Sequence, residues 1–397
     1  MKKVICLIFV FVLVFFTGVK AYAFDPPTST TTSDTESEIT SQINDMDFTD
    51  IENTIESMPN EAKNILNGRS FSSYISDIAL GKEDVSVSSI LNQLSSVFMS
   101  SAITSIMTMC SILVVVILLS MLNTLKSSFN SEGVSTVAHF ACYLMICALI
   151  SSSVIRVIST GYEAVENMTA YTQGVFPILL GLLTALGSAF ASGILQPAMT
   201  ILTTTIAGTF KDAIYPIAVS GTAMTFVSDI SDAVNLEGIT KLIKTVCQWV
   251  MGIVFTIFLG VITIQGMGYS AIDGISIKTM KYAIDKSVPV IGGLFSDTVD
   301  TVLGCSIIAK NALGIGGLML LILIISVPVI NMVATIFTFR LTASLVQIIS
   351  EDRIAKLLND IASYLMLTVL IVASIGIMFF ITICITIWAG NFTAMMR

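Results

Sequence analysis

The dominant pattern in the chain is a series of long apolar stretches that starts near residue 100 and continues almost to the last residue. Each stretch is longer than the roughly 20 residues that an α-helix needs to cross a bilayer, and most are poor in charge. The pattern predicts an all-α fold, a polytopic integral membrane helix bundle over 100–390 with a short tail at 391–397. Eight segments are expected, at 100–125, 134–158, 172–195, 199–227, 246–272, 288–309, 312–339 and 364–389.

Three other patterns precede the membrane domain. Lys2 and Lys3 lead into an apolar run and then Ala21-Tyr22-Ala23, which predicts a cleavable signal peptide over 1–23, with an uncleaved anchor as the alternative. Residues 24–47 are rich in Ser, Thr, Pro and acid and predict a disordered acidic tether. Residues 48–99 carry apolar positions at helical spacing and predict short extracytoplasmic amphipathic helices.

Composition agrees with a membrane protein, because 54% of the residues are hydrophobic and only 12% are charged, against about 25% charged in soluble domains. The net charge of -8 is concentrated before the first segment. This acidity disfavours nucleic acid, whose phosphates require clustered Lys and Arg. Loops 126–133, 196–198, 273–287 and 340–363 hold slightly more cations than the opposite loops, so they are expected in the cytoplasm and the N-terminal segment outside it.

An internal similarity links two parts of the membrane domain. A shift of 112 residues places the Pro177 region on the Pro289 region and Pro216 on Pro328. Two three-span units, 134–227 and 246–339, are a hypothesis that fits, and an odd number of crossings would invert the second unit relative to the first. Chance matching in apolar sequence is the alternative. If the repeat holds, helices broken at these four prolines would meet near the middle of the membrane.

Four charges stand deepest in apolar sequence, namely Lys211, Asp212, Asp297 and Asp300. A charge at the centre of a bilayer costs on the order of 3 kcal/mol or more, so such residues usually face an interior. One hypothesis is a polar pathway lined by these side chains. The alternative is that their segments lie at the interface and the charges are in water.

The sequence gives no sign of catalysis. Six of the seven cysteines follow residue 100 in apolar stretches and form no CxxC pair, and the only histidine is His139. No nucleotide, zinc-protease or serine-hydrolase motif occurs. We therefore expect no enzyme activity, no cofactor and no metal site. Small residues at helix-packing spacing, such as Gly181 and Ala185, predict a tight bundle or self-association.

The order of features resembles one known family. The features are the signal, the acidic segment, a first span ending Leu122-Asn123-Thr124-Leu125-Lys126, the stretch from Phe176-Pro177 to Gln196-Pro197, and the late helix at Asp352-Arg353-Ile354. Together they resemble the stage III sporulation protein AE family over nearly the whole chain.

The resemblance implies a multipass protein of the mother-cell membrane around the developing spore in endospore-forming Firmicutes. It implies partners from an eight-protein operon, the stage III sporulation A operon, and from the forespore membrane. Together these would form a transenvelope secretion-like channel that sustains late forespore gene expression. An autonomous secondary transporter and a non-conducting membrane scaffold are the alternatives.

Overall fold

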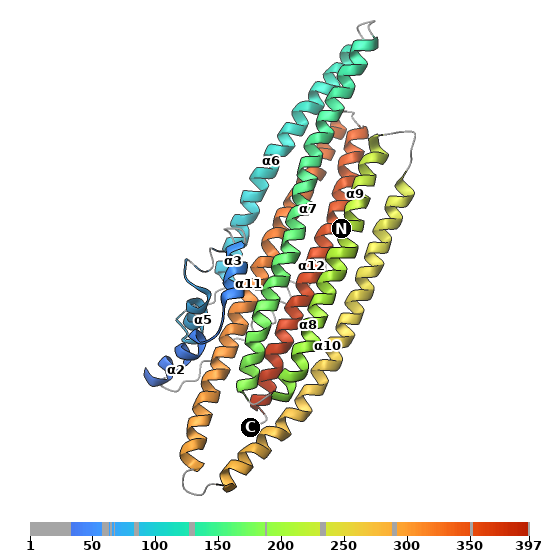
Figure 1. Ribbon diagram of the computed structural model, residues 1–397. Helices are drawn as coiled ribbons and strands as arrows, with labels where there is room; N and C mark the ends of the chain where they lie inside the picture. Colours follow the sequence, from blue (N-terminus) through green and yellow to red (C-terminus); the bar gives the residue numbers. More distant parts are fainter. Residues whose placement is uncertain are drawn as a thin grey trace.

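In the part of the chain that it describes, the computed structural model consists of helices and the turns between them (Figure 1). The predicted signal peptide and Pro289 lie outside this part, as does the start of the predicted tether. The described residues are 33–57, 63, 66, 68–82, 87–126, 132–186, 189–230, 236–287, 292–349 and 352–395.

Three short helices precede the bundle: α2 (Ser33–Asn44), α3 (Thr49–Ser57) and α5 (Phe71–Ala79). The structure differs from the predicted tether over 33–44, because Ile39 and Ile43 of α2 are fully buried and their burial offsets the cost of ordering this polar stretch. Asp47 precedes α3 and accepts hydrogen bonds from the backbone N–H (3.0 Å) and hydroxyl (2.6 Å) of Thr49. These bonds lower the pKa of Asp47.

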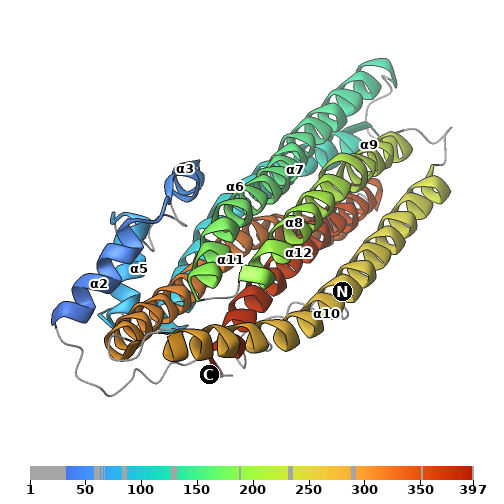
Figure 2. The same ribbon diagram turned by 60° about the horizontal axis from the view of Figure 1, so that its bottom comes forward.

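The chain then passes six times along one bundle (Figures 1 and 2). The third pass is assembled from three pieces and includes a π-helical turn, η2. The passes are α6 (Val87–Lys126), α7 (Glu132–Ala185), α8 (Ala189–Gly208) with η2 (Thr209–Ile214) and α9 (Tyr215–Ile230), α10 (Glu237–Ser287), α11 (Gly292–Ile348) and α12 (Asp352–Met395). Most of the predicted tail therefore belongs to α12.

Long-range contacts fix the directions of the helices. The Lys310 ammonium on α11 donates to the Ile387 carbonyl near the end of α12 (3.1 Å), while Gly376 lies against Ile325, so these two helices are antiparallel. Leu94 of α6 packs near Leu323 of α11. Ser101, further along α6, contacts a residue further along α11, so α6 and α11 are parallel.

The number of passes differs from the eight predicted segments. Segment 134–158 and most of 172–195 form the single helix α7, and the described part of 288–309 continues into 312–339 as α11. The predicted breaks are polar stretches in which two side chains, Tyr171 and Lys310, find partners on other helices. The Tyr171 hydroxyl donates to the Gly317 carbonyl (2.8 Å), and Lys310 is satisfied on α12. With those partners available, the helix does not need to end.

The inverted arrangement expected for the internal repeat is also wrong. The two candidate units, 134–227 and 246–339, each contain two passes instead of three. An even number of passes gives both units the same orientation. The first pass of each unit descends in Figure 1 and the second ascends. One consequence is that residues 273–287, predicted to be cytoplasmic together with 126–133, form the last part of α10 and lie at the opposite end of the bundle from Lys126, where α6 ends.

Five of the helices are long and apolar enough to cross a membrane, within the described residues. The spans of α11 and α12 are 72% and 61% buried inside the protein, whereas those of α6, α7 and α10 are 22–39% buried. Thus α11 and α12 form the centre, and the outer helices expose apolar side chains such as Met107 and Trp249. This distribution is that of a membrane protein whose outer face contacts lipid.

The longest helices are much longer than a bilayer is thick. At about 1.5 Å per residue, the 54 residues of α7 and the 57 of α11 extend over roughly 80 Å. A hydrocarbon core is about 30 Å thick. When these helices stand upright, part of the bundle therefore lies outside the hydrocarbon core.

Candidate functional site

The structure places Lys211 and Asp212 in the π-helical turn η2. The Lys211 ammonium lies 3.1 Å from Glu166 Oε1 and 4.7 Å from the centre of the Tyr162 ring, both on α7. The Asp212 side chain is exposed. Lys211 therefore joins α7 to the third pass, and neither residue lines the two described cavities.

The remaining predicted residues are only partly described. Asp297 and Asp300 belong to α11, but their side chains lie outside the described part, so their role in a pathway stays a prediction. Pro177 and Pro328 lie inside continuous helices instead of at breaks. Pro216 is the second residue of α9. The residue between it and η2 is Tyr215, whose N–H donates to the Phe210 carbonyl in the wider π pattern.

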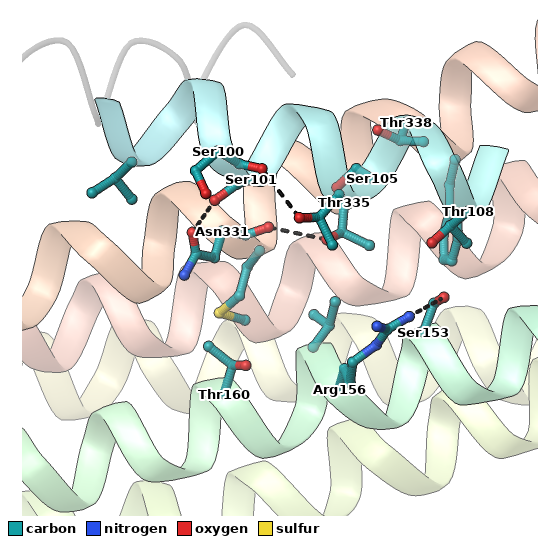
Figure 3. A pocket seen from close by; sticks show the side chains of 15 residues that line it. Ser100, Ser101, Ser105, Thr108, Ser153, Arg156, Thr160, Asn331, Thr335 and Thr338 are labelled. Carbon is teal, nitrogen blue, oxygen red and sulfur yellow. Dashed lines mark hydrogen bonds between the residues drawn. The ribbon is translucent and has the colours of Figure 1, made fainter. Parts of the chain in front are cut away.

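A polar cavity of about 300 Å³ lies elsewhere, between α6, α7 and α11 (Figure 3). The α6 wall carries hydroxyl residues at helical spacing, and Figure 3 shows them facing Asn331 and Thr335 of α11 and, on α7, Thr160 and Arg156. The lining residues are Val97, Ser100, Ser101, Thr104, Ser105, Thr108, Ser153, Arg156, Val157, Thr160, Asn331, Met332, Thr335, Thr338 and Phe339.

A second cavity, also of about 300 Å³, continues the first toward the N-terminal helices. Thr160 and Asn331 line both cavities. The second is lined by Ser57, Thr160, Glu163, Ala164, Asn167, Leu323, Ile324, Val327, Pro328 and Asn331. We call the two cavities together the polar groove. From Leu323 to Phe339 on α11 it extends for about 24 Å at 1.5 Å per residue, most of the thickness of a hydrocarbon core.

The hydrogen bonds of the wall determine what the groove offers a solute. The hydroxyls of Thr104, Thr335 and Thr338 donate to carbonyls of their own helices at 3.0–3.2 Å. Their oxygen lone pairs are the remaining hydrogen-bonding capacity, so these residues act as acceptors. Arg156 Nη2 donates to Ser153 Oγ (3.2 Å), and this bond uses one of the five N–H donors of the guanidinium group. Such a wall holds water or a polar solute in an otherwise apolar bundle.

The N-terminal helices close one end of the groove. Ser57, the last residue of α3, lines the second cavity, and its hydroxyl donates to Asn167 Oδ1 of α7 (3.4 Å). Close packing also holds α5 against the bundle, because a Cβ at Gly316 of α11 would lie 2.5 Å from Ile75 Cδ1 of α5. Ser306 of α11 also donates to Gln42 of α2 (3.2 Å). The predicted amphipathic helices thus rest on the bundle itself.

Among the described residues, no group of three or more His, Cys, Asp or Glu side chains is placed to hold a metal ion. The six described cysteines, Cys110, Cys142, Cys147, Cys247, Cys305 and Cys384, are unpaired thiols. The chemistry of the described site is therefore that of hydrogen bonding and charge.

Comparison with known proteins identifies the family. The family described as stage III sporulation protein AE matches residues 69–390. The chain belongs to this family. The stage III sporulation protein AE of Bacillus subtilis (strain 168) is 28% identical over 261 residues, which cover 66% of this chain and 65% of that relative. The match thus spans slightly less than two thirds of the relative, and no solved structure matches the chain. The resemblance to the stage III sporulation protein AE family is confirmed.

Sequence reasoning missed the polar groove. Arg156 lies at the end of the predicted segment 134–158, and the serines and threonines of α6 are uncharged, so the sequence alone did not predict that either belongs to a site. A signal was present, because Ser101, Thr104, Ser105 and Thr108 follow helical spacing within an apolar segment. The partner walls on α7 and α11 lie far away in the sequence, so the spacing alone does not show what the stripe faces.

Proposed function

We propose that the chain is a membrane subunit of a channel complex that connects mother cell and forespore and is required for endospore formation and late forespore gene expression. It lies in the mother-cell membrane with its N-terminal helices outside the cytoplasm. Its partners are the other proteins of the stage III sporulation A operon and a forespore membrane protein. It acts by conduction or assembly and catalyses no reaction.

The polar groove is the observation that carries the conducting role, and family membership supports the place in sporulation. A purely structural bundle in lipid gains by filling its interior with apolar or small side chains. Here hydroxyls, Asn331 and Arg156 line a groove of about 24 Å by the helical rise. Polar groups inside a membrane bundle usually face an aqueous cavity or a solute route.

The first experiment is an in-frame deletion in the source organism, scored for heat-resistant spores and for a late forespore transcription reporter. We expect both to be lost after engulfment is complete and to return when the gene is expressed in the mother cell. Normal spores from the deletion strain would refute the proposal. Substrate flux through the purified protein alone in vesicles would instead indicate an autonomous transporter.

A pair of bulky substitutions then separates conduction from scaffolding. Thr335→Trp fills the groove, whereas Ile103→Trp adds the same side chain to the exposed face of α6. Both variants are checked for membrane level and for co-purification with partners. We expect Thr335→Trp alone to abolish the forespore reporter signal while partner binding persists. Full activity with a filled groove would support a non-conducting scaffold.

A further inference from the structure

Two opposite charges stand at separate positions along the polar groove. Arg156 lines the first cavity and Glu163 the second, and both come from α7. They are seven residues apart, so they lie on the same face of the helix about 10 Å from each other along its axis. Within the described part of the chain, neither forms a salt bridge. The groove thus carries a cation and an anion at backbone positions about 10 Å apart along the helix.

The wall between the two charges is suited to a peptide backbone. Thr160 and Asn331 line both cavities and stand between the charged residues. The Thr160 hydroxyl and the Asn331 amide each carry donor and acceptor groups, which match the C=O and N–H groups of a peptide backbone. The pyrrolidine ring of Pro328 and the side chain of Val327 give an apolar strip along the second cavity.

We propose that the polar groove binds a short zwitterionic peptide, with its terminal carboxylate on Arg156 and its terminal ammonium on Glu163. As a statement of what the channel carries, this assignment rests on the proposed function. A free amino acid is too short, because its nitrogen and carboxyl carbon are only about 2.5 Å apart. Each added residue extends the chain by about 3.3–3.6 Å, so about three residues match the separation.

The test is a binding series with the purified full-length protein in lipid nanodiscs, measured by titration calorimetry. The probes are serine, the serine dipeptide, tripeptide and pentapeptide, and the tripeptide with an acetylated N-terminus or an amidated C-terminus. We expect affinity to peak near the tripeptide and to fall about five- to tenfold when either terminus is blocked. Equal affinity for the free and blocked tripeptides would overturn the proposal. Stronger binding of the acetylated form would identify a simple anion site and also overturn it.

Two variants assign the termini. Arg156→Gln should remove the preference for a free carboxylate over an amide, and Glu163→Gln should remove the preference for a free amine over an acetylated one. Glu166→Gln is the matched control, because Glu166 is on the same helix but pairs with Lys211 outside the groove. It should keep both preferences. If Glu166→Gln behaves like Glu163→Gln, the proposal is refuted. The peptide series with the unmodified protein decides the question should a variant fail to fold.

The outcome is separable from that of the proposed function. If the deletion strain makes normal spores while the tripeptide binds as expected, the channel role fails and the site remains. If the deletion blocks sporulation but the series shows no dependence on length or termini, the channel role stands and the peptide assignment fails.

Discussion

A close contact between the two central helices predicts a strong effect of one methyl group. A Cβ added at Gly376 of α12 would lie 2.8 Å from Cγ1, 2.9 Å from Cδ1 and 2.9 Å from Cγ2 of Ile325 on α11. Carbon atoms pack without strain at about 3.5–4.0 Å. Both branches of the isoleucine are in the way, so turning one aside brings the other closer. In Gly376→Ala, the helices must therefore move apart.

The expected magnitude follows from two opposing terms. Overpacking a tight interior costs about 1–3 kcal/mol, while replacing a helical glycine by alanine gains up to about 1 kcal/mol. Gly376→Ala should thus lower the free energy of unfolding by about 0–2 kcal/mol. Gly252→Ala on α10 is the matched control, because nothing lies within 4 Å of its added Cβ. Gly252→Ala therefore receives only the gain in helix propensity, without the cost of overpacking.

The assay is reversible unfolding in mixed detergent micelles, followed by fluorescence of Trp249 and Trp388. The two variants should differ by about 1–3 kcal/mol, with Gly252→Ala the more stable. Combining Gly376→Ala with Ile325→Ala should recover part of the loss, because the smaller side chain leaves room for the methyl group. A Gly376→Ala protein at least as stable as the Gly252→Ala control would refute the reasoning.

Three further predictions concern the bundle, its contact with the N-terminal helices, and the helix α3. Tyr171→Phe removes the hydrogen bond to α11 and should cost about 1 kcal/mol in the same unfolding assay; no loss would contradict the buried bond. A short thiol crosslinker should join cysteines placed at Ser57 and Asn167. Gly316→Leu should lower the yield of this crosslinked product by pushing α5 away from α11, and equal yields with and without Gly316→Leu would contradict the packing. The pKa of Asp47 is lowered from 3.8, so its stabilisation of α3 is complete above about pH 4 and is lost as the pH falls through the lowered pKa. Amide hydrogen exchange in α3 should therefore depend on pH in this range, and Asp47→Asn should remove that pH dependence.

The apolar pattern was sufficient to predict the class of fold but not the number of passes. Segments 100–125, 246–272 and 364–389 each lie within one helix, since nothing polar interrupts them for long. The stretch between 158 and 172 was treated as a connection because it carries Glu163, Glu166 and Tyr171. In the folded bundle, Lys211 pairs with Glu166 and the Gly317 carbonyl accepts a hydrogen bond from Tyr171, so these polar groups do not end the helix. Local sequence does not reveal partners that are 45 or more residues away.

The candidate site could be predicted even less completely. Lys211 was recognised because a charge in apolar sequence is conspicuous, but its partner Glu166 places it away from the described cavities. The groove depends on uncharged hydroxyls, which hydropathy barely registers, and on three helices whose directions and offsets decide which residues face one another. Arg156 gains its meaning only from this arrangement, because the opposite walls come from α6 and α11.

The way the N-terminal helices pack also sets an order of events during synthesis. Ile75 emerges early, but Gly316, against which it packs, follows about 240 residues later. At roughly 5–20 residues per second, the ribosome needs about 12–48 seconds to reach it. During this interval the apolar faces of α2 and α5 have no α11 to cover them, whereas α3 meets its partner α7 earlier. α2 and α5 therefore reach their final packing only after α11 has been synthesised.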